Sequence, residues 1–276
     1  MTADDVLSFR WIGDEPAYID EPHVDRCGDV VIGAYGGASG SGAFKNEDAA
    51  WVLCHPAGEW RFAALVDGHY SCESDEAIFA VLDARKNALI EAMTQPAGAA
   101  FEAVRRLLLD GFNSDAFRQA CRTVVGEASA IFAAQKGRFV FWLSVGDCLG
   151  FALHPELGAQ GQFAMNQRHF YEWIGKSNVF ELDPVPFSSG VQELRTGLNA
   201  VALVTDGLYE YPNSPFEDPT AVYTTLGPPQ PDLAAGAMRA LTTVHRGRGR
   251  DSATIIAWQV VVQEPATRSS PAPRPF

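Results

Sequence analysis

Three strongly apolar segments of the sequence lead into an aspartate that adjoins a glycine. The segments span residues 62–68, 139–147 and 201–207, and their aspartates are Asp67, Asp147 and Asp206. An Asp-Gly pair is a common turn signal, which is the ordinary explanation for a single occurrence. Asp67, however, leads towards a helical segment, and Asp206 leads into residues 208–212 rather than into a matching strand. A simple hairpin turn is therefore a weak explanation for these two aspartates.

Carboxylates at the ends of buried strands indicate a cation-binding site. Partial burial removes water from such a carboxylate, so its charge needs a cation or hydrogen bonds as compensation. Further acidic residues precede apolar segments: Glu47 and Asp48 stand before Ala49, and Asp251 stands before Ala253. A set of oxygen ligands selects Mg²⁺ or Mn²⁺, and the sequence has no His/Cys cluster of the kind that binds zinc. Two such ions close together activate water and hold a phosphoryl group.

Short strand patterns and longer helical patterns would have to position these carboxylates. Strand patterns cover residues 9–12, 30–35, 49–54, 62–66, 124–125, 128–134, 139–145, 149–153, 201–205 and 253–262. Helical spacing of apolar residues covers 73–93, 101–109, 112–122, 221–226 and 233–244. The consecutive strands between 123 and 153 favour antiparallel meander pairing. Residues 154–198 are less periodic and predict an elaborated loop with a short helix.

Composition and charge narrow the classes of partner and compartment. Of 276 residues, 47% are hydrophobic, and 34 acidic against 21 basic residues give a formal net charge of −13. Such an acidic surface disfavours nucleic acid and anionic membranes as partners. No apolar run reaches the roughly 18 residues of a membrane span and the N-terminus does not resemble a signal peptide, so we expect a cytoplasmic protein. The five scattered cysteines predict free thiols rather than disulfides or a zinc site.

The order of these motifs resembles that of the type 2C, metal-dependent protein serine/threonine phosphatases. The matching segments are Asn46-Glu47-Asp48, Val66-Asp67-Gly68-His69, Ser144-Val145-Gly146-Asp147, Thr205-Asp206-Gly207-Leu208 and Arg250-Asp251-Ser252-Ala253-Thr254. The resemblance implies an α+β fold, a four-layer α/β/β/α sandwich of two mainly antiparallel sheets flanked by helices. It also implies a single catalytic domain over residues 1–262, with a flap or insert region at 154–198. We expect residues 263–276 to form a disordered, proline-rich tail.

By this resemblance, six residues would hold the metal ions. They are Glu47, Asp67, Gly68 through its carbonyl oxygen, Asp147, Asp206 and Asp251. The cofactors would be two Mg²⁺ or Mn²⁺ ions, with a third, weaker ion held by Asp147 and Asp206 in bacterial members. Asp48 would orient the water that the ions activate, and His69 matches the family's candidate general acid, which protonates the leaving alkoxide. The implied reaction is hydrolysis of phosphoserine or phosphothreonine in a phosphorylated protein substrate, and we expect the protein to be a monomer.

Several residues depart from the family pattern. Ala43 stands where many members carry a phosphate-binding arginine, and Lys45 could supply a point charge in its place without the arginine fork. In the 154–198 region, Trp173 and Lys176 could contact substrate, although core packing is their ordinary explanation. Two other functions therefore stay open. One is a catalytically weak, phosphatase-like regulatory module that binds phosphoproteins or metal, and the other is a small-molecule phosphomonoesterase.

Overall fold

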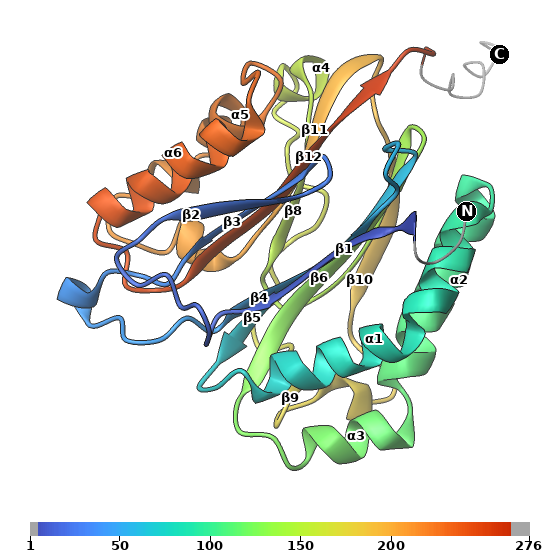
Figure 1. Cartoon of the computed structure of the whole chain (residues 1–276), viewed down its shortest axis with the longest axis vertical. Coiled ribbons are helices and arrows are strands. Elements are labelled where there is room, and N and C mark those ends of the chain that lie inside the picture. The colour runs from blue at the N-terminus through green and yellow to red at the C-terminus, as the bar shows by residue number, and fades with distance from the viewer. Residues whose placement is uncertain (1–4, 266–276) are drawn as a thin grey trace, which may run out of the picture.

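Two antiparallel β-sheets lie face to face in the computed structural model, which describes residues 5–265 (Figure 1). The seven-stranded sheet has the order β1-β4-β5-β6-β7-β10, with β9 paired to β6, and the five-stranded sheet has the order β2-β3-β12-β11-β8. The strands of the seven-stranded sheet are β1 (Leu7–Ile12), β4 (Asp48–Cys54), β5 (Trp60–His69), β6 (Glu127–Lys136), β7 (Phe139–Val145), β9 (Ile174–Gly175) and β10 (Ser188–Glu193). The strands of the five-stranded sheet are β2 (His23–Cys27), β3 (Val30–Tyr35), β8 (Leu149–Leu153), β11 (Gly197–Val204) and β12 (Ala253–Val262).

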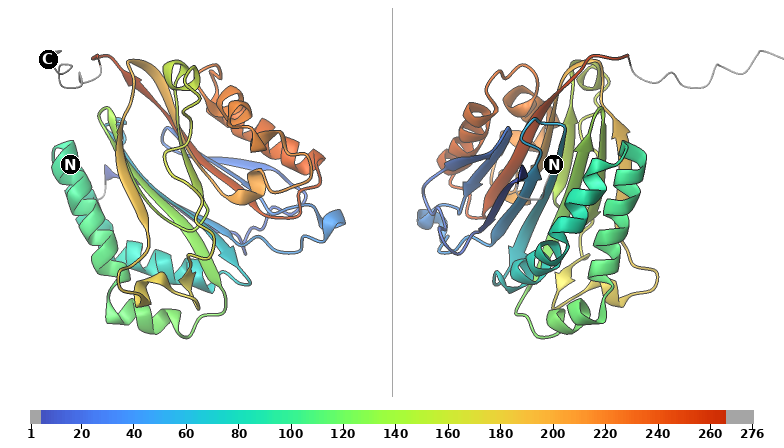
Figure 2. Two further views of the ribbon diagram at one scale, coloured as in Figure 1. Left: turned by 180° about the vertical axis from the view of Figure 1, so that it is seen from behind. Right: turned by 45° about the vertical axis from the view of Figure 1, so that its right-hand side comes forward.

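Helices cover the outer face of each sheet, as Figure 2 shows from two further sides. The seven-stranded sheet is covered by α1 (Glu73–Thr94), α2 (Ala97–Phe112) and α3 (Asp115–Cys121), and the five-stranded sheet by α5 (Pro219–Leu226) and α6 (Leu233–Arg246). The remaining helical turns are α4 (Pro155–Gly158), η2 (Ser39–Ser41), η3 (Val179–Glu181), η4 (Asp206–Leu208) and η5 (Pro215–Glu217). This arrangement is a four-layer α/β/β/α sandwich, and the predicted fold class is confirmed.

Helix α1 illustrates how the outer layer forms. Its buried residues include Ile78, Leu82, Leu89 and Met93, whose spacing places them on one face against the sheet. Its first turn carries Glu73, Asp75 and Glu76, and negative charge is favourable at the positive end of the helix dipole. The helix begins four residues after β5 ends, so the end of β5 and the start of α1 lie at the same edge of the molecule (Figure 1).

The central strands alternate between an inner face towards the other sheet and an outer face towards the helices. On β5, Ala63 and Leu65 pack between the sheets, whereas Phe62 and Ala64 pack in the cluster that includes α1 and α2. Because the period is two, the inner face of each strand also receives the polar residue at the end of its apolar run. These polar residues are Asp48 on β4, Asp67 on β5, Ser129 on β6, Thr205 after β11 and Thr254 on β12. All five are at most 4% exposed, which creates a buried polar end to an otherwise apolar layer.

Most predicted elements are confirmed within a few residues, and the meander β4-β5-β6-β7 pairs antiparallel as expected. Three differences matter. The predicted strand at 124–125 is wrong, because these residues form bends that lead into β6. Strands β2 and β10 were not predicted, since both are largely polar and partly exposed edge strands. Strand β5 continues through Asp67, Gly68 and His69, because these residues stay paired with β6.

Other expectations have mixed outcomes. All five cysteines lie in the described part of the chain and are free thiols, as predicted. Within residues 5–265, no helix is both long and apolar enough to span a membrane. Residues 266–276, which hold most of the predicted tail, lie outside the described residues.

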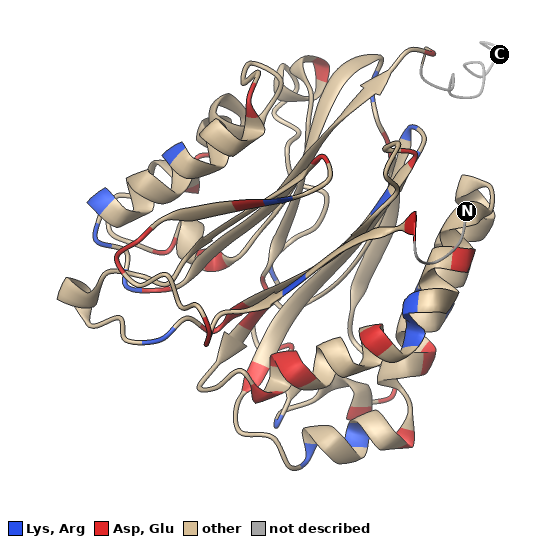
Figure 3. Cartoon of the chain, in the orientation of Figure 1, with Lys and Arg blue, Asp and Glu red and all other residues tan. Residues whose placement is uncertain are grey.

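Figure 3 shows acidic residues spread over many surface elements, including several on α1.

Candidate metal centre

Three aspartates converge at the polar end of the inter-sheet layer. Asp67 comes from β5, Asp147 from the connection between β7 and β8, and Asp206 from the start of η4, directly after β11. One carboxylate oxygen of each lies within 4.8 Å of those of the other two. The three residues are only 4%, 4% and 6% exposed, respectively. Oxygens Oδ2 of Asp67 and Oδ1 of Asp147 have no hydrogen-bond partner in the described part of the chain. Buried oxygens that can only accept, and that nothing donates to, fit a divalent cation.

Glycines allow this convergence. Gly207 follows Asp206, and a Cβ atom on it would lie 1.8 Å from the carbonyl oxygen of Ser252, so only glycine lets η4 approach the start of β12 this closely. Gly146 precedes Asp147 and has a φ of 88°, a left-handed conformation that glycine adopts without strain. The glycines beside two of the predicted ligands therefore place the carboxylates.

Burial and mutual repulsion make the charged state of this cluster unfavourable without a cation. Burial raises the pKa of Asp67 well above its ordinary value, and the neighbouring Asp206, Asp48 and Asp251 add to the rise. The pKa of Asp206 is raised to about 8, first by burial and then by the charges of Asp251, Glu210 and Asp147. A bound divalent ion reverses this balance, because it stabilises the carboxylates as anions.

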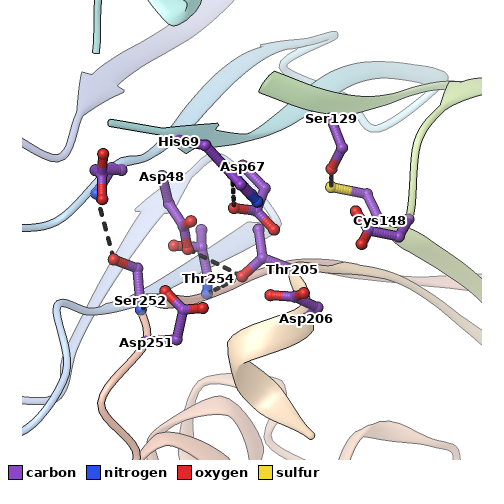
Figure 4. A network of polar contacts seen from close by, with 12 residues as sticks. Asp48, Asp67, His69, Ser129, Cys148, Thr205, Asp206, Asp251, Ser252 and Thr254 are labelled. Carbon is purple, nitrogen blue, oxygen red and sulfur yellow. Dashed lines mark hydrogen bonds and ion pairs between the residues drawn. The ribbon is translucent and has the colours of Figure 1, made fainter. Parts of the chain in front are cut away.

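Asp48 links the two sheets behind the cluster (Figure 4). It pairs with Asp67 across β4 and β5, and its Oδ2 accepts a hydrogen bond from Thr205 Oγ1 at 2.9 Å. Thr205 Oγ1 in turn accepts from the backbone N–H of Thr254, also at 2.9 Å. Burial raises the pKa of Asp48 to about 7, although the hydrogen bond from Thr205 opposes the rise. Asp48 is thus held beside the cluster by contacts with both sheets.

Glu47 lies at the rim of the cluster rather than inside it. Its Oε1 contacts Lys45 Nζ at 2.6 Å, and Lys45 Nζ also donates to the carbonyl oxygen of Tyr70 at 3.0 Å. The backbone of Glu47 is tied to other predicted residues, since its carbonyl accepts from Gly68 N at 3.0 Å and its N–H donates to Ser252 Oγ at 3.3 Å. Lys45 therefore neutralises a predicted metal ligand whose backbone is bonded to Gly68.

Asp251 and His69 complete the set of predicted residues. Asp251 stands just before β12 and lies beside Asp206 in Figure 4, with its Oδ1 accepting from Ser252 N at 2.9 Å. His69 Nδ1 lies 3.6 Å from Asp67 Oδ1, and the His69 ring lies 4.8 Å from that of Trp173, centroid to centroid. The structure therefore brings every predicted site residue to one end of the sandwich, with Asp67, Asp147 and Asp206 closest together.

Three charged residues near the centre, Arg168, Glu210 and Asp75, were not predicted. Arg168 contacts Asp147, Asp206 and Glu210, and it belongs to the 154–198 region, where the sequence drew attention to Trp173 and Lys176 instead. Trp173 does reach His69, but Lys176 is exposed and donates to the carbonyl of Arg122. The sequence signal for Arg168 was weak, since it lies in a segment without periodicity and outside the five motifs.

Asp75 is the third of these residues. It is fully buried in the first turn of α1, and neither carboxylate oxygen has a hydrogen-bond partner in residues 5–265. A Cβ atom on Gly68 would lie 2.8 Å from both oxygens. Burial raises its pKa well above the ordinary value, and the charges of Asp48 and Glu47 add to the rise. An aspartate at this position usually indicates a favourable helix-dipole contact, so the sequence did not distinguish it.

Comparisons with known proteins place the chain among solved structures. No protein-family model and no curated protein matches it. PppA, described as a key regulatory component of T6SS in Pseudomonas aeruginosa, matches with a TM-score of 0.60 at 18% identity, over 83% of this chain and 95% of that one. A bacterial serine phosphatase matches with a TM-score of 0.61 at 14% identity, over 88% and 100%. RsbX in complex with magnesium matches with a TM-score of 0.55 at 14% identity, over 86% and 98%.

These matches cover nearly the whole length of the other chains, and their low identities make them a likeness of fold. The fold is also the one implied by the order of the five sequence motifs. The chain therefore has the fold of the bacterial type 2C (PPM) serine/threonine phosphatases.

Proposed function

We propose that this protein is a phosphatase that depends on Mg²⁺ or Mn²⁺ and hydrolyses phosphoserine and phosphothreonine in protein substrates. The observation that carries the proposal is the cluster of Asp67, Asp147 and Asp206, whose buried oxygens lie within 4.8 Å of one another and include unpaired acceptors. The proposal is supported by the shared fold with bacterial serine phosphatases and with a neighbour that was solved with magnesium. We also propose that the catalytic unit spans residues 1–262 and acts as a monomer.

Each predicted residue has a distinct part in this proposal. Glu47, Asp67, Asp206, Asp251 and the Gly68 carbonyl would hold two ions, which supply Lewis-acid polarisation of the phosphoryl group and activation of water, and Asp147 lies beside Asp206 at the position of a third, weaker ion. Asp48, fixed by Thr205, accepts a proton or a hydrogen bond from the attacking water. His69 is partly exposed and held near Asp67 at 3.6 Å, so its ring can deliver a proton to the leaving alkoxide.

Lys45 is the proposed contact for the substrate phosphate. Its side chain is 36% exposed and lines a cavity of about 330 Å³ together with Glu47, Glu210 and Asp251. As a point charge it attracts a phosphate without the paired donors of an arginine. Because the same ammonium group neutralises Glu47, its contribution to substrate binding depends on how that ion pair rearranges.

A second candidate is a phosphatase-like regulatory module with little turnover. Two observations favour it: Ala43 replaces the expected phosphate-binding arginine, and Lys45 pairs with a predicted metal ligand at 2.6 Å. Such a module would bind divalent ions or phosphoproteins without hydrolysing them.

The test is turnover of p-nitrophenyl phosphate and of a phosphothreonine peptide with Mn²⁺, compared between the wild type, Asp206→Asn and the control Asp115→Asn. Asp115 is an exposed residue in the first turn of α3, in the outer helical layer. We expect activity that requires Mn²⁺, a loss of about a hundredfold or more in Asp206→Asn and wild-type activity in Asp115→Asn. A folded wild type that binds Mn²⁺ at two sites without turnover supports the regulatory module instead, and an unchanged rate in Asp206→Asn contradicts the assigned centre. Turnover of p-nitrophenyl phosphate and of phosphorylated metabolites, but of no phosphopeptide, would favour the small-molecule phosphomonoesterase.

A further inference from the structure

A fixed positive charge already lies within the candidate metal centre. Arg168 belongs to the connection between β8 and β9, and its Nη2 lies 3.4 Å from Asp206 Oδ2 and 3.5 Å from Asp147 Oδ2. The same nitrogen also contacts the carboxylate of Glu210. Two of the three converging aspartates therefore share one guanidinium, whereas Asp67 has no such contact in the described part of the chain.

The Arg168 side chain is held in place by aromatic rings. Its guanidinium carbon lies 4.6 Å from the ring centroid of Phe170 and 4.9 Å from that of Tyr209. A guanidinium placed on aromatic faces gains cation–π stabilisation and loses conformational freedom. The hydroxyl of Tyr209 donates to the carbonyl oxygen of Asp147 at 3.3 Å, so the ring that holds the arginine also contacts the backbone of its partner.

The backbone around Arg168 is fixed as well. The N–H of His169 donates to the carbonyl of Gly146 at 2.9 Å, directly beside Asp147. The Asn166 side chain donates to Ser144 Oγ at 3.0 Å and to the carbonyl of Cys148 at 2.8 Å. Arg168 is therefore anchored on both sides of the sequence to the turn that carries Asp147.

Geometry and chemistry make this guanidinium a competitor for a metal ion. An ion bound between Asp147 and Asp206 would need the two Oδ2 atoms that now face Arg168 Nη2. Arginine stays protonated at all physiological pH values, so it cannot leave the site by losing its charge. Displacing it would also leave the Glu210 carboxylate without this partner and would break the contacts with Phe170 and Tyr209.

We propose that Arg168 is a resident cation that occupies the Asp147–Asp206 side of the centre and excludes a metal ion from that position. The two ions of the proposed function are unaffected, the third position between Asp147 and Asp206 stays closed to a metal ion, and removal of the guanidinium creates this additional divalent-cation site. This inference rests on the proposed metal centre but not on phosphatase activity.

The test is the number of Mn²⁺ ions bound per chain, measured by equilibrium dialysis and elemental analysis of protein purified in Mn²⁺. Arg168→Met keeps much of the side-chain length and removes the charge. The matched control is Arg122→Met, since Arg122 lies on the outer surface, 61% exposed at its side chain and paired with Glu181 at 2.9 Å. We expect Arg168→Met to bind one more ion than the wild type and Arg122→Met to bind the wild-type number.

A second measurement covers a variant that is unstable without metal. In EDTA, Arg168→Met should have a lower Tm than the wild type and Arg122→Met, and Mn²⁺ should raise its Tm more than it raises theirs. An ion count in Arg168→Met equal to that of the wild type overturns the proposal, whether or not either protein is active. An additional ion in Arg168→Met supports it even when no protein hydrolyses a phosphopeptide, in which case only the proposed function fails.

Discussion

Strand β5 carries a buried charge at each end, and the two ends differ in how the protein compensates it. Arg61 and Asp67 lie on the same inner face of the strand, separated by Ala63 and Leu65, which pack between the sheets. Both residues are nearly buried, at 5% and 4% exposure. Six residues of strand place them about 20 Å apart, too far for one to neutralise the other.

The Arg61 end is compensated within the protein. Arg61 Nε donates to Asp29 Oδ1 at 3.1 Å, and its terminal nitrogens contact Asp29 Oδ2, the Gly58 carbonyl and Gln135 Oε1. Gln135 lies on the inner face of β6, opposite Arg61 in register. Gln135 on the neighbouring strand and Asp29 therefore satisfy the buried Arg61 guanidinium, as is typical of a structural ion pair.

The Asp67 end has no such compensation. Asp67 faces Asp48 and Ser129 across the sheet, its Oδ2 is unpaired within residues 5–265, and its near neighbours include further carboxylates. A buried charge that is fully satisfied contributes to stability, whereas one that lacks protein partners remains available to a ligand. This contrast can be tested at both ends of the strand.

The largest expected effect comes from Asp67→Asn. We expect metal-dependent phosphatase activity to fall by about a hundredfold or more, because a central ligand charge is lost. In EDTA the same variant should be at least as stable as the wild type, since a neutral amide does not repel Asp206 and Asp48. Activity assays and thermal unfolding in EDTA check the two expectations. A Tm well below that of the wild type would show that Asp67 is a structural charge after all.

The opposite result is expected for Arg61→Met. Loss of the guanidinium leaves Gln135 and a half-exposed Asp29 without their partner, so the free energy of unfolding should fall by about 2 kcal/mol. Mn²⁺ affinity should not change, and calorimetric titration checks this. The control is Arg26→Met, whose ion pair with Asp232 is more than half exposed on both sides and should be worth less than about 1 kcal/mol. A large loss of Mn²⁺ affinity in Arg61→Met would break the division between the two ends.

The raised pKa values of the aspartates around Asp67 predict how pH affects the stability of the metal-free protein. The pKa values of Asp206 and Asp48 are raised to about 8 and about 7, above those of the unfolded chain, so folding favours their protonated forms. Their contribution to stability is complete below the unfolded pKa near 3.9 and is lost as the pH rises through 7 and 8. In EDTA, the Tm should therefore fall between pH 5.5 and 8.5, and the fall should be smaller in Asp206→Asn. Saturating Mn²⁺ should remove most of this decline, and a decline that Mn²⁺ leaves intact would count against metal binding by these groups.

The smallest effect is expected at Lys45, where the compensating ion pair is partly exposed. Lys45→Met should change the free energy of unfolding by less than about 1 kcal/mol. If Lys45 binds the substrate phosphate, the KM for p-nitrophenyl phosphate should rise about threefold to tenfold with little change in kcat. Lys45→Arg should restore the charge and most of the KM. An unchanged KM in Lys45→Met would restrict its role to the pair with Glu47.

The fold was largely predictable because its strands carry clear local signals. The predicted bounds of the strand at 253–262 agree with β12, and those at 139–145 agree with β7, since both are apolar runs bounded by turn residues. Strand β10 was missed because its sequence from Ser188 to Glu193 has no apolar alternation, and only its pairing with β7 makes it a strand. Pairing between distant segments is decided by the whole sheet and leaves no local pattern.

The site was predictable where acidic residues adjoin buried strands. Asp67 and Asp206 follow apolar runs, and this placement alone indicates loss of hydration. Arg168 and Asp75 could not be found in this way. Arg168 is brought to the centre by hydrogen bonds between its connection and the β7–β8 turn, and Asp75 by the packing of α1 on Gly68. Their positions depend on tertiary contacts that no spacing in the sequence records.

The origin of the proposed ligands in both sheets has a consequence for the lifetime of the protein. Asp67 belongs to the seven-stranded sheet, whereas Asp206 and Asp251 adjoin strands of the five-stranded sheet. An ion held between them would act as a reversible cross-link that joins residues almost two hundred positions apart and that only the folded chain can form. At a free ion concentration one hundred times the Kd, such a link stabilises the folded state by about 2.7 kcal/mol. The fraction of folded protein, and with it the resistance to proteolysis, would then follow the supply of divalent cations.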